Sequence, residues 1–295
     1  MSYSVIHADC FPWMETRDEN SVTAIVTDPP YGVKEYTEKE LEKQRSGKGG
    51  VWRIPPSFDG HERKALPRFS VINDDPAERE SVYSFFYRWA KSAIRVLVPG
   101  GHVFIASTPL LSDILSRSMR DAGFERRGEI IRTVCTLRGG DRPKGAEAEF
   151  SDISVIPRGL WEPWGLYRKP LSEKTVAENL HVWNAGALRR EAEETPFCDL
   201  IPSGKTPRVE REIAPHPSIK PQAFLRKIVY ASLPLGSGVI LDPFSGSGST
   251  LAAASYCGYD SIGVEKDGIF YQLSRDAIPK LAALYPMQTQ IRLPV

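Results

Sequence analysis

Short apolar strands alternate with amphipathic helices at both ends of the chain, and this alternation constrains the fold more than any other feature. The expected strands are residues 4–9, 23–28, 102–107, 238–243 and 261–266. The expected helices are residues 76–97, 110–123, 220–233, 248–258 and 269–284, with Pro279 marking a kink or a boundary in the last one. Such alternation predicts an α/β fold built on a doubly wound, mostly parallel sheet.

Two segments interrupt this pattern. Residues 34–70 are rich in Lys, Arg, Gly and Pro and show no clear period, and residues 137–215 are charged and rich in Pro. We therefore expect the regular α/β unit to comprise residues 1–136 and 214–295. Residues 34–70 would form a loop of this unit, and residues 137–213 would form an inserted region.

The composition is that of a soluble globular protein and excludes several other classes. Of the 295 residues, 41% are hydrophobic and 25% are charged, and the formal net charge is +1. No apolar run approaches the ~20 residues that span a bilayer, and the N-terminus lacks an export signal. We therefore expect a cytoplasmic protein without a membrane partner. The 4 cysteines form no CxxC pair and no zinc-ligand spacing, so we expect no metal site.

A rigid acidic corner follows the second expected strand, in the stretch Asp28-Pro29-Pro30-Tyr31. Each proline fixes its own φ angle and lacks an N–H donor, so the strand cannot continue beyond Asp28. In open α/β sheets, ligands bind at this edge. A carboxylate and an aromatic ring held there favour a site for a flat, polar ligand.

A glycine-rich turn connects a late strand to the helix that follows it. Gly246 and Gly248 can adopt positive φ angles and let a ligand approach the backbone, while the helix start offers N–H groups. No Gly-Lys-Ser/Thr follows, which excludes a phosphate-loop ATPase, and Leu251 occupies the place of the third glycine of a dinucleotide fingerprint. The next strand ends at Glu265, which is placed to accept hydrogen bonds from a ribose diol. Together these features favour a cofactor that contains a nucleoside.

Three stretches taken together resemble the amino-specific DNA methyltransferases: TDPPYG, then HPSIKPQAF at residues 216–224, then LDPFSGSGST. Their order resembles that of the permuted β class, in which a target-recognition region separates the catalytic tetrapeptide from the cofactor turn. Ser218 and Ile219 stand where that class usually has Thr-Gln. WEPWGLYRKP at residues 161–170 also resembles a strand of these enzymes. The resemblance implies a Rossmann-like methyltransferase fold, with S-adenosyl-L-methionine as the cofactor.

The resemblance also implies which residues bind the cofactor. Glu265 would hold the ribose hydroxyls, and Asp9 would contact the adenine amine, although Asp9 is equally suited to cap the helix that follows it. His216 and Lys220 lie where these enzymes approach the cofactor carboxylate. The full expected set is Asp9, Cys10, His216, Lys220, Asp242, Pro243, Phe244, Gly246, Gly248, Ser249, Thr250 and Glu265.

The implied catalytic residues are Asp28, Pro29, Pro30 and Tyr31. The Asp28 carboxylate and the Pro29 carbonyl would accept hydrogen bonds from the NH₂ group of a base and stabilise its developing positive charge, while Tyr31 stacks on the base. A paired base cannot reach such a pocket, so it must be flipped out of the duplex. Asp in the first position is usual for adenine N6 enzymes and Ser for cytosine N4 enzymes. We therefore expect adenine N6, with cytosine N4 as the alternative.

Basic residues in the two interrupting segments are candidates for DNA binding. Residues 45–53, RSGKGGVWR, either hold the DNA backbone around the flipped nucleotide or form a solvated surface loop. Residues 137–213 would read the DNA sequence, because Arg to guanine is the commonest specific base contact. The candidate contacts are Arg45, Lys48, Arg53, Arg138, Arg142 and Lys144.

Two other functions stay open at the level of sequence: methylation of an RNA amine, and a non-catalytic module that binds DNA or cofactor. Methylation of cytosine C5 is excluded, because it needs a nucleophilic cysteine, normally after Pro, and no cysteine of this chain follows Pro. The expected partners are double-stranded DNA, a cognate restriction endonuclease and, by analogy with the permuted class, a second copy of the chain in a homodimer.

Overall fold

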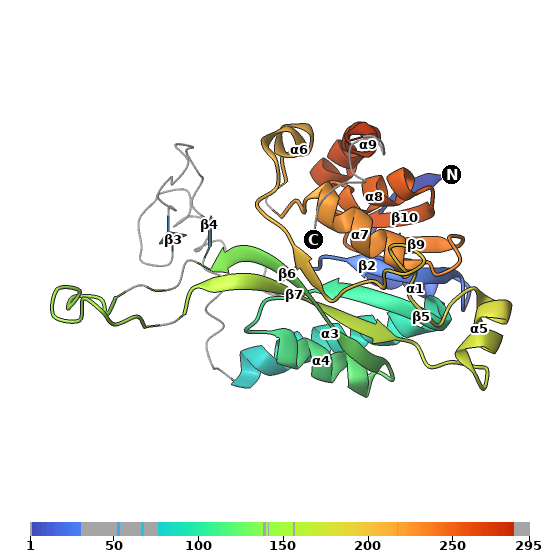
Figure 1. The fold of residues 1–295 in the computed structure, drawn as a ribbon, viewed down its shortest axis with the longest axis horizontal. Helices are drawn as coiled ribbons and strands as arrows, with labels where there is room; N and C mark the ends of the chain where they lie inside the picture. The colour runs from blue at the N-terminus through green and yellow to red at the C-terminus, as the bar shows by residue number, and fades with distance from the viewer. Residues whose placement is uncertain are drawn as a thin grey trace.

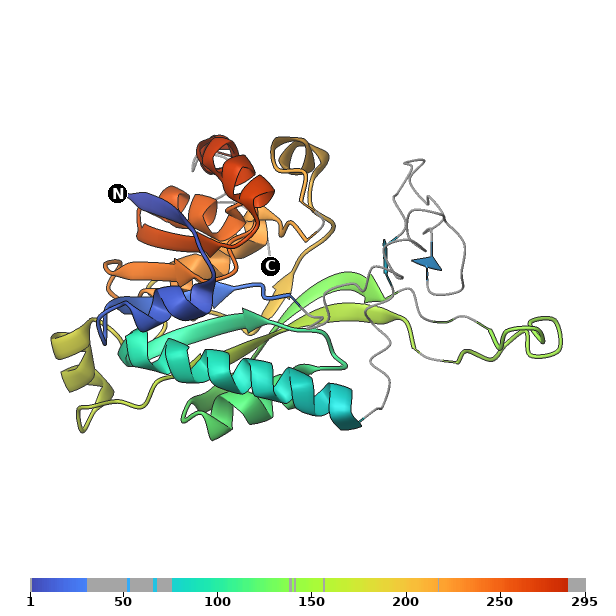
Figure 2. The same ribbon diagram turned by 180° about the vertical axis from the view of Figure 1, so that it is seen from behind.

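The computed structural model describes residues 2–30, 52–53, 66–67, 76–137, 140, 142–155, 157–216 and 218–285. This part of the chain forms three layers, with a central sheet between two layers of helices (Figure 1). The view from behind shows helix α3 along one face of the sheet and helices α7, α8 and α9 on the opposite face (Figure 2).

The central sheet has eight strands in the order β1-β10-β9-β2-β5-β7-β6-β8 among the described residues. They are β1 (Tyr3–His7), β2 (Val22–Thr27), β5 (Leu97–Ala106), β6 (Glu125–Leu137), β7 (Gly159–Arg168), β8 (Leu200–Pro202), β9 (Val239–Asp242) and β10 (Asp260–Glu265). The first five strands in spatial order pair in parallel, β7 is antiparallel to both of its neighbours, and β8 is parallel to β6. The prediction of a doubly wound, mostly parallel α/β sheet is confirmed. Two short strands, β3 (Trp52–Arg53) and β4 (Leu66–Pro67), form a separate antiparallel pair.

The helices divide between the two faces of the sheet. One face is covered by α1 (Cys10–Glu15), α3 (Pro76–Val96) and α4 (Ser112–Asp121), and the other by α7 (Gln222–Ser232), α8 (Ser249–Cys257) and α9 (Gly268–Ala283). Helices α5 (Val176–Trp183) and α6 (Arg208–Ile213) lie at the periphery. No helix within the described ranges is both long and apolar enough to cross a membrane.

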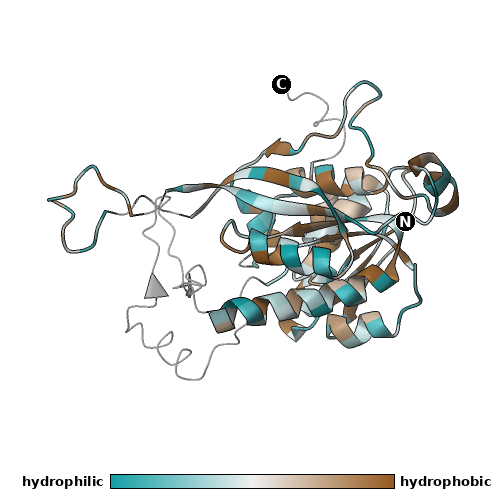
Figure 3. Cartoon of the chain, turned by 90° about the horizontal axis from the view of Figure 1, so that it is seen from below, coloured by the Kyte–Doolittle hydropathy of each residue, from teal (hydrophilic) through white to brown (hydrophobic). Residues whose placement is uncertain are grey.

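The central strands are buried on both faces, as expected for parallel strands between helical layers. In β5, Val103 and Ile105 join the apolar cluster beneath α3 and α4, whereas Phe104 and Ala106 join the cluster beneath α7 and α8. This alternation follows from the two-residue period of a strand. The outer helices carry alternating hydrophilic and hydrophobic stretches, because each buries one side against the sheet (Figure 3).

The strand order reverses between β9 and β2, which are neighbours in the sheet. From β2 the chain crosses through α3 to β5 on one side, and from β9 it crosses through α8 to β10 on the other. In open α/β sheets, ligands bind in the crevice at such a reversal, outside the carboxyl ends of the strands. The fold thus brings the acidic corner after β2 and the glycine turn after β9 to one place.

The structure differs from the sequence-based expectations at two places. Of the two alternatives expected at Pro279, a kink or a boundary, the boundary is wrong, because α9 runs through this residue. Ile278 and Leu281 are fully buried against α8, and this packing outweighs the hydrogen bond that a proline removes. Strands β7 and β8 fall within residues 137–213, yet they extend the central sheet, so the inserted region shares its hydrogen-bonded framework with the rest of the molecule.

Candidate active site

Four carboxylates lie along the same edge of the sheet, because the parallel strands β1, β10, β9 and β2 are consecutive neighbours. Asp9 follows β1, Glu265 ends β10, Asp242 ends β9 and Asp28 follows β2. The side chains of β2 and β9 are joined directly, since the buried Thr27 hydroxyl donates a hydrogen bond to Asp242 Oδ1 at 2.7 Å. Two segments more than two hundred positions apart therefore meet at the edge where the sequence predicted a site.

Asp28 is held by the loop that precedes α7. Ser218 Oγ donates to Asp28 Oδ2 at 2.8 Å, and the Lys220 ammonium also binds Asp28 Oδ2. The side chain of Asp28 is 15% exposed and that of Lys220 is 8% exposed, so both charges are largely removed from water. Pro29 and Pro30 follow Asp28 and fix the direction of the chain at this point.

Lys220 has a second carboxylate partner, Glu162 of β7, whose Oε1 lies 3.4 Å from Lys220 Nζ. Burial lowers the pKa of the Lys220 ammonium, but the carboxylates of Asp28 and Glu162 outweigh burial, so its pKa is raised overall. Lys220 is therefore charged at neutral pH. In this structure Lys220 therefore contacts two protein carboxylates, Asp28 and Glu162. Its predicted role in binding the carboxylate of the cofactor stays a prediction.

The glycine turn is built for close approach. Gly248 has a φ angle of 81° and caps the N-terminus of α8. A Cβ atom at Gly248 would lie 2.4 Å from Ile278 Cγ1, so no larger residue fits. Gly246, with a φ angle of 50°, lies against His216, whose Nε2 would be 3.1 Å from an added Cβ. The structure therefore places two sequence-predicted residues together, Gly246 of the turn and His216 beside it.

Glu265 fastens the glycine turn to the neighbouring strand. Its Oε2 accepts a hydrogen bond from the Gly246 amide at 2.7 Å, and its Oε1 accepts one from the Asp267 amide at 2.7 Å. Asp267 in turn caps α9 by accepting from the amides of Ile269 and Phe270. Both oxygens of the strand-end acid thus point toward the backbone at the predicted cofactor site.

Asp242 is buried at 3% exposure between these features. Burial raises the pKa of its carboxyl to about 7, although the hydrogen bonds from Thr27 and from the Phe244 amide oppose the shift. The Phe244 ring packs toward Trp89, with ring centroids 6.1 Å apart. The Asp242-Pro243-Phe244 segment therefore anchors the start of the turn in the core.

The remaining predicted cofactor residues surround the turn. Ser249 and Thr250 are buried in the first turn of α8, and Ser249 Oγ is buried without a hydrogen-bond partner among the described residues. Asp9 accepts a hydrogen bond from the Phe11 amide at 3.0 Å, which confirms it as the N-cap of α1. Burial raises the pKa of the Cys10 thiol to about 12, so this thiol is not reactive at neutral pH.

His216 faces the turn from the loop before α7. Its ring packs edge-on against Phe270 with centroids 4.3 Å apart, and its Nδ1 accepts a hydrogen bond from the Ser218 amide at 3.1 Å. Burial lowers the pKa of His216, so the imidazole is neutral at neutral pH. A single short loop thus supplies one neighbour to the glycine turn and two to Asp28.

Three of the six candidate DNA contacts, Arg45, Lys48 and Arg138, lie outside the described residues, and of Arg53 only the backbone in β3 is described. Tyr31 of the catalytic tetrapeptide also lies outside them. Arg142 and Lys144 are exposed on the segment that joins β6 to β7. This segment projects away from the helical layers, on the side of the molecule opposite α5 (Figure 1).

Three polar residues of this region were not predicted from the sequence. Thr27 donates to Asp242, Glu162 pairs with Lys220, and Arg132 pairs with Glu162. Arg132 and Glu162 are 5% and 7% exposed and lie in the middle of strands, where charged residues are rare without a partner. The sequence signal was an acid within the otherwise apolar stretch WEPWG, which indicates a buried ion pair.

Comparison with known proteins agrees with this geometry. A model of N6/N4 methyltransferases, described as DNA methylase, matches residues 22–276. The type II methyltransferase M2.DpnII of Streptococcus pneumoniae is 24% identical over 272 residues, which cover 92% of this chain and 87% of the relative.

Solved structures share the fold. TTHA0409 of Thermus thermophilus, in complex with S-adenosyl-L-methionine, superposes with a TM-score of 0.58 at 19% identity and covers 96% of each chain. The cytosine-N4-specific PvuII DNA methyltransferase superposes with a TM-score of 0.58 at 13% identity, over 96% of this chain and 92% of its own. Since the family model spans most of the sequence, the chain belongs to the N6/N4 DNA methylase family and is an amino-specific DNA methyltransferase.

Proposed function

We propose that this enzyme transfers a methyl group from S-adenosyl-L-methionine to adenine N6 at specific sites in double-stranded DNA, and that it belongs to the permuted β class. The observation that carries the proposal is the junction of the acidic corner with the glycine turn, closed by the 2.7 Å hydrogen bond from Thr27 to Asp242. A base held at Asp28 lies next to a donor held at the turn, and in-line transfer requires this proximity.

The site fits the cofactor. Gly246 and Gly248 bring no side chain to the turn and hold positive φ angles that larger residues rarely adopt, and the buried Ser249 hydroxyl has bonding capacity to offer. A carboxylate has about four acceptor positions, so Glu265 can receive ribose hydroxyls in addition to its two backbone amides. The cofactor supplies an electrophilic methyl group bonded to a sulfonium sulfur. The turn residues bind and orient that group toward Asp28.

Asp28 and Pro29 act on the acceptor. The lone pair of an aromatic amine is delocalised into the ring, which makes the nitrogen a weak nucleophile. Hydrogen bonds from the NH₂ group to the Asp28 carboxylate and the Pro29 carbonyl favour a more tetrahedral nitrogen and stabilise the positive charge that develops as the N–C bond forms. Pro30 fixes the carbonyl direction, and Tyr31 stacks on the flipped base.

The base is the finer part of the proposal. The tetrapeptide begins with Asp, which favours adenine N6, whereas the cytosine-N4-specific PvuII enzyme has the same overall fold. Both amines present similar geometry to one carboxylate. Mass spectrometry of nucleosides from DNA methylated by the purified enzyme distinguishes the two: N6-methyladenine supports the proposal, and N4-methylcytosine replaces it.

The assignment of Asp28 is tested with Asp28→Ala. We expect methyl transfer to DNA to be lost while the dissociation constant for S-adenosyl-L-methionine stays within a few-fold, because the carboxylate acts on the amine. Isothermal titration with the cofactor confirms that the variant is folded. Substantial turnover by this variant would remove Asp28 from its role.

DNA recognition would fall to residues 137–213 and to the loop at residues 34–70. The exposed Arg142 and Lys144 support this division, because both lie on the segment that projects from the sheet. A cognate restriction endonuclease, a homodimer and a cytoplasmic location accompany the proposal as predictions, the first in line with the type II relatives.

A further inference from the structure

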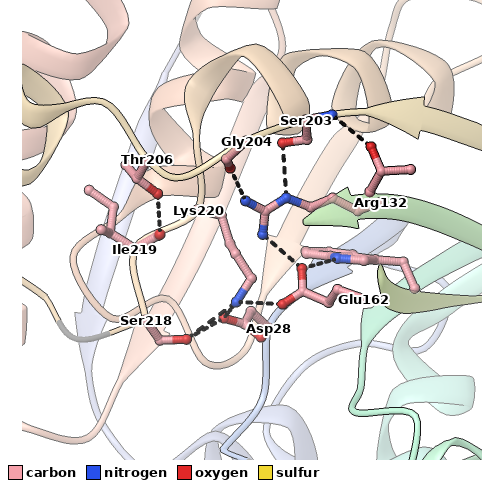
Figure 4. A network of polar contacts seen from close by, with 11 residues as sticks. Asp28, Arg132, Glu162, Ser203, Gly204, Thr206, Ser218, Ile219 and Lys220 are labelled. Carbon is pink, nitrogen blue, oxygen red and sulfur yellow. Dashed lines mark hydrogen bonds and ion pairs between the residues drawn. The ribbon is translucent and has the colours of Figure 1, made fainter. Parts of the chain in front are cut away.

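Four charged side chains of alternating sign form a continuous row of ion pairs, the charge chain, that starts at the acidic corner: Asp28, Lys220, Glu162 and Arg132 (Figure 4). Lys220 bridges Asp28 and Glu162, and Glu162 Oε2 accepts from Arg132 Nη1 at 2.9 Å. The side chains of Lys220, Glu162 and Arg132 are at most 10% exposed, so the chain runs through the interior. It links the end of β2 to the hairpin of β6 and β7.

The hairpin end of the chain is rigidly held. Arg132 and Glu162 are direct cross-strand partners in the β6–β7 register. Arg132 also donates to Ser203 Oγ at 3.1 Å and to the Gly204 carbonyl at 2.8 Å. Glu162 Oε2 receives a second hydrogen bond, from Trp164 Nε1 at 3.0 Å. With Oε2 fixed by two donors, Glu162 directs Oε1 toward the Lys220 ammonium.

We propose that Glu162, locked by Arg132 and Trp164, is a positioning residue that holds Lys220 between two carboxylates and thereby fixes the Asp28 carboxylate for the target amine. This inference rests on the proposed role of Asp28 as the acceptor of the amine hydrogen bond. Neither Glu162 nor Arg132 contacts substrate in this scheme. Both act through Lys220.

The physical reason lies in the properties of lysine. Its ammonium is a point charge with three donors on a flexible stem, so a lysine alone does not hold a carboxylate in one orientation. An ammonium paired with Asp28 alone would also compensate much of the negative charge that the developing positive charge of the amine needs. Sharing the ammonium with Glu162 restrains its position and keeps Asp28 a strong acceptor.

The proposal gives Lys220 a different function from the one its sequence position implies. If Lys220 bound the cofactor carboxylate, loss of its Glu162 partner would weaken donor binding and raise the KM for S-adenosyl-L-methionine. If it positions Asp28, the same change lowers kcat and leaves that KM nearly unchanged. The two roles therefore separate in steady-state kinetics.

The test is Glu162→Gln, with Glu125→Gln as the matched control. Glu125 pairs with Arg168 across the same two strands, with 2.7 Å between Oε2 and Nη2, but lies away from Asp28. We expect Glu162→Gln to lower kcat by about ten-fold or more, since small misplacements of reacting groups have effects of this size, and to change the KM for the donor by less than about three-fold. The control is expected to keep the wild-type kcat.

The pH profile supplies a readout that a purely structural role does not move. Among the described residues, the charged and titratable groups that act on Lys220 include Asp28 after β2, Glu162 of β7, Arg132 of β6 and His216 of its own loop. Removing the Glu162 charge leaves burial in place, so the pKa of Lys220 falls and the alkaline decline of kcat begins at lower pH. The control is expected to leave this decline where it is in the wild type.

A second variant tests whether a loss of kcat comes from misfolding rather than from misplacement of Asp28. Glu162→Gln combined with Arg132→Gln removes both charges, keeps hydrogen-bonding groups between the strands, and is checked by donor binding and thermal melting. A drop in kcat in both variants, with donor binding retained, supports the proposal. Wild-type kcat in either folded variant, or a loss that tracks donor affinity, overturns it. An active Asp28→Ala enzyme overturns instead the proposed function on which the inference rests.

Discussion

Asp242 offers a quantitative test of the electrostatics at the junction of the two motifs. Its carboxyl is 3% exposed, and burial raises its pKa from 3.8 to about 7. Between these two values the folded state holds a proton on Asp242 that the unfolded state releases. The contribution of Asp242 to stability is therefore greatest at low pH and decreases as the pH rises through 7.

The magnitude follows from the two pKa values. With a folded pKa of about 7 and an unfolded pKa of 3.8, the contribution of Asp242 to the free energy of unfolding is about 3 kcal/mol at about pH 5 and near zero at about pH 8.5. Asp242→Asn removes this titration. Its Oδ1 can still accept the hydrogen bonds that Thr27 and the Phe244 amide donate to the carboxylate.

The measurement is urea unfolding of the wild type and of Asp242→Asn at both pH values. His216, whose pKa is lowered by burial, destabilises the fold at low pH in both proteins, so the comparison uses the difference between them. We expect the stability of the variant relative to the wild type to increase by about 3 kcal/mol on going from about pH 5 to about pH 8.5. Asp113→Asn, at an exposed carboxylate, serves as the control. A variant whose stability parallels the wild type at every pH would refute the reasoning.

Three further outcomes are expected. Gly248→Ala places a Cβ in contact with α9 at a positive φ angle, so it should lower the free energy of unfolding by about 2 kcal/mol or more and weaken binding of S-adenosyl-L-methionine, as seen by urea unfolding and calorimetry. Thr27→Val removes the hydrogen bond to the buried carboxylate and should cost about 1–3 kcal/mol in the same unfolding assay. Replacing Arg142 and Lys144 by Ala should reduce the slope of log K against log[salt] for DNA binding by up to about 2, whereas Lys174→Ala, at an exposed site near α5, should leave that slope unchanged. Equal slopes for the wild type and the double variant would place the segment between β6 and β7 outside the DNA interface.

Much of the site's position could be predicted because it depends on local patterns. Short apolar strands that end in an acid identified Asp28, Asp242 and Glu265, and the parallel order of the sheet placed these ends on one edge. Proline and glycine fixed the turns between them. The roles of these residues in binding and catalysis are not tested by the fold alone and stay predictions.

The rest depends on pairing that a single sequence does not reveal. Arg132 and Glu162 are 30 positions apart and meet only because of the β6–β7 register. Strand β6 contains five charged residues, so its pattern does not resemble that of a core strand. The capping box of Thr175 and Glu178 at the start of α5 was, by contrast, a readable signal that the sequence reasoning missed.

The buried charge chain is better explained by function than by stability. Removing four charges from water carries a desolvation penalty of several kcal/mol per ion, and apolar residues of similar volume often stabilise such positions equally well or better. A hydrophobic cluster could therefore join β6, β7 and the loop before α7 at lower cost. It could not orient a carboxylate. The charge chain begins at Asp28 and ends at Arg132 in the β6–β7 hairpin, and the loop of that hairpin carries Arg142 and Lys144. The charge chain therefore connects the segment proposed to contact DNA with the residue proposed to bind the target amine.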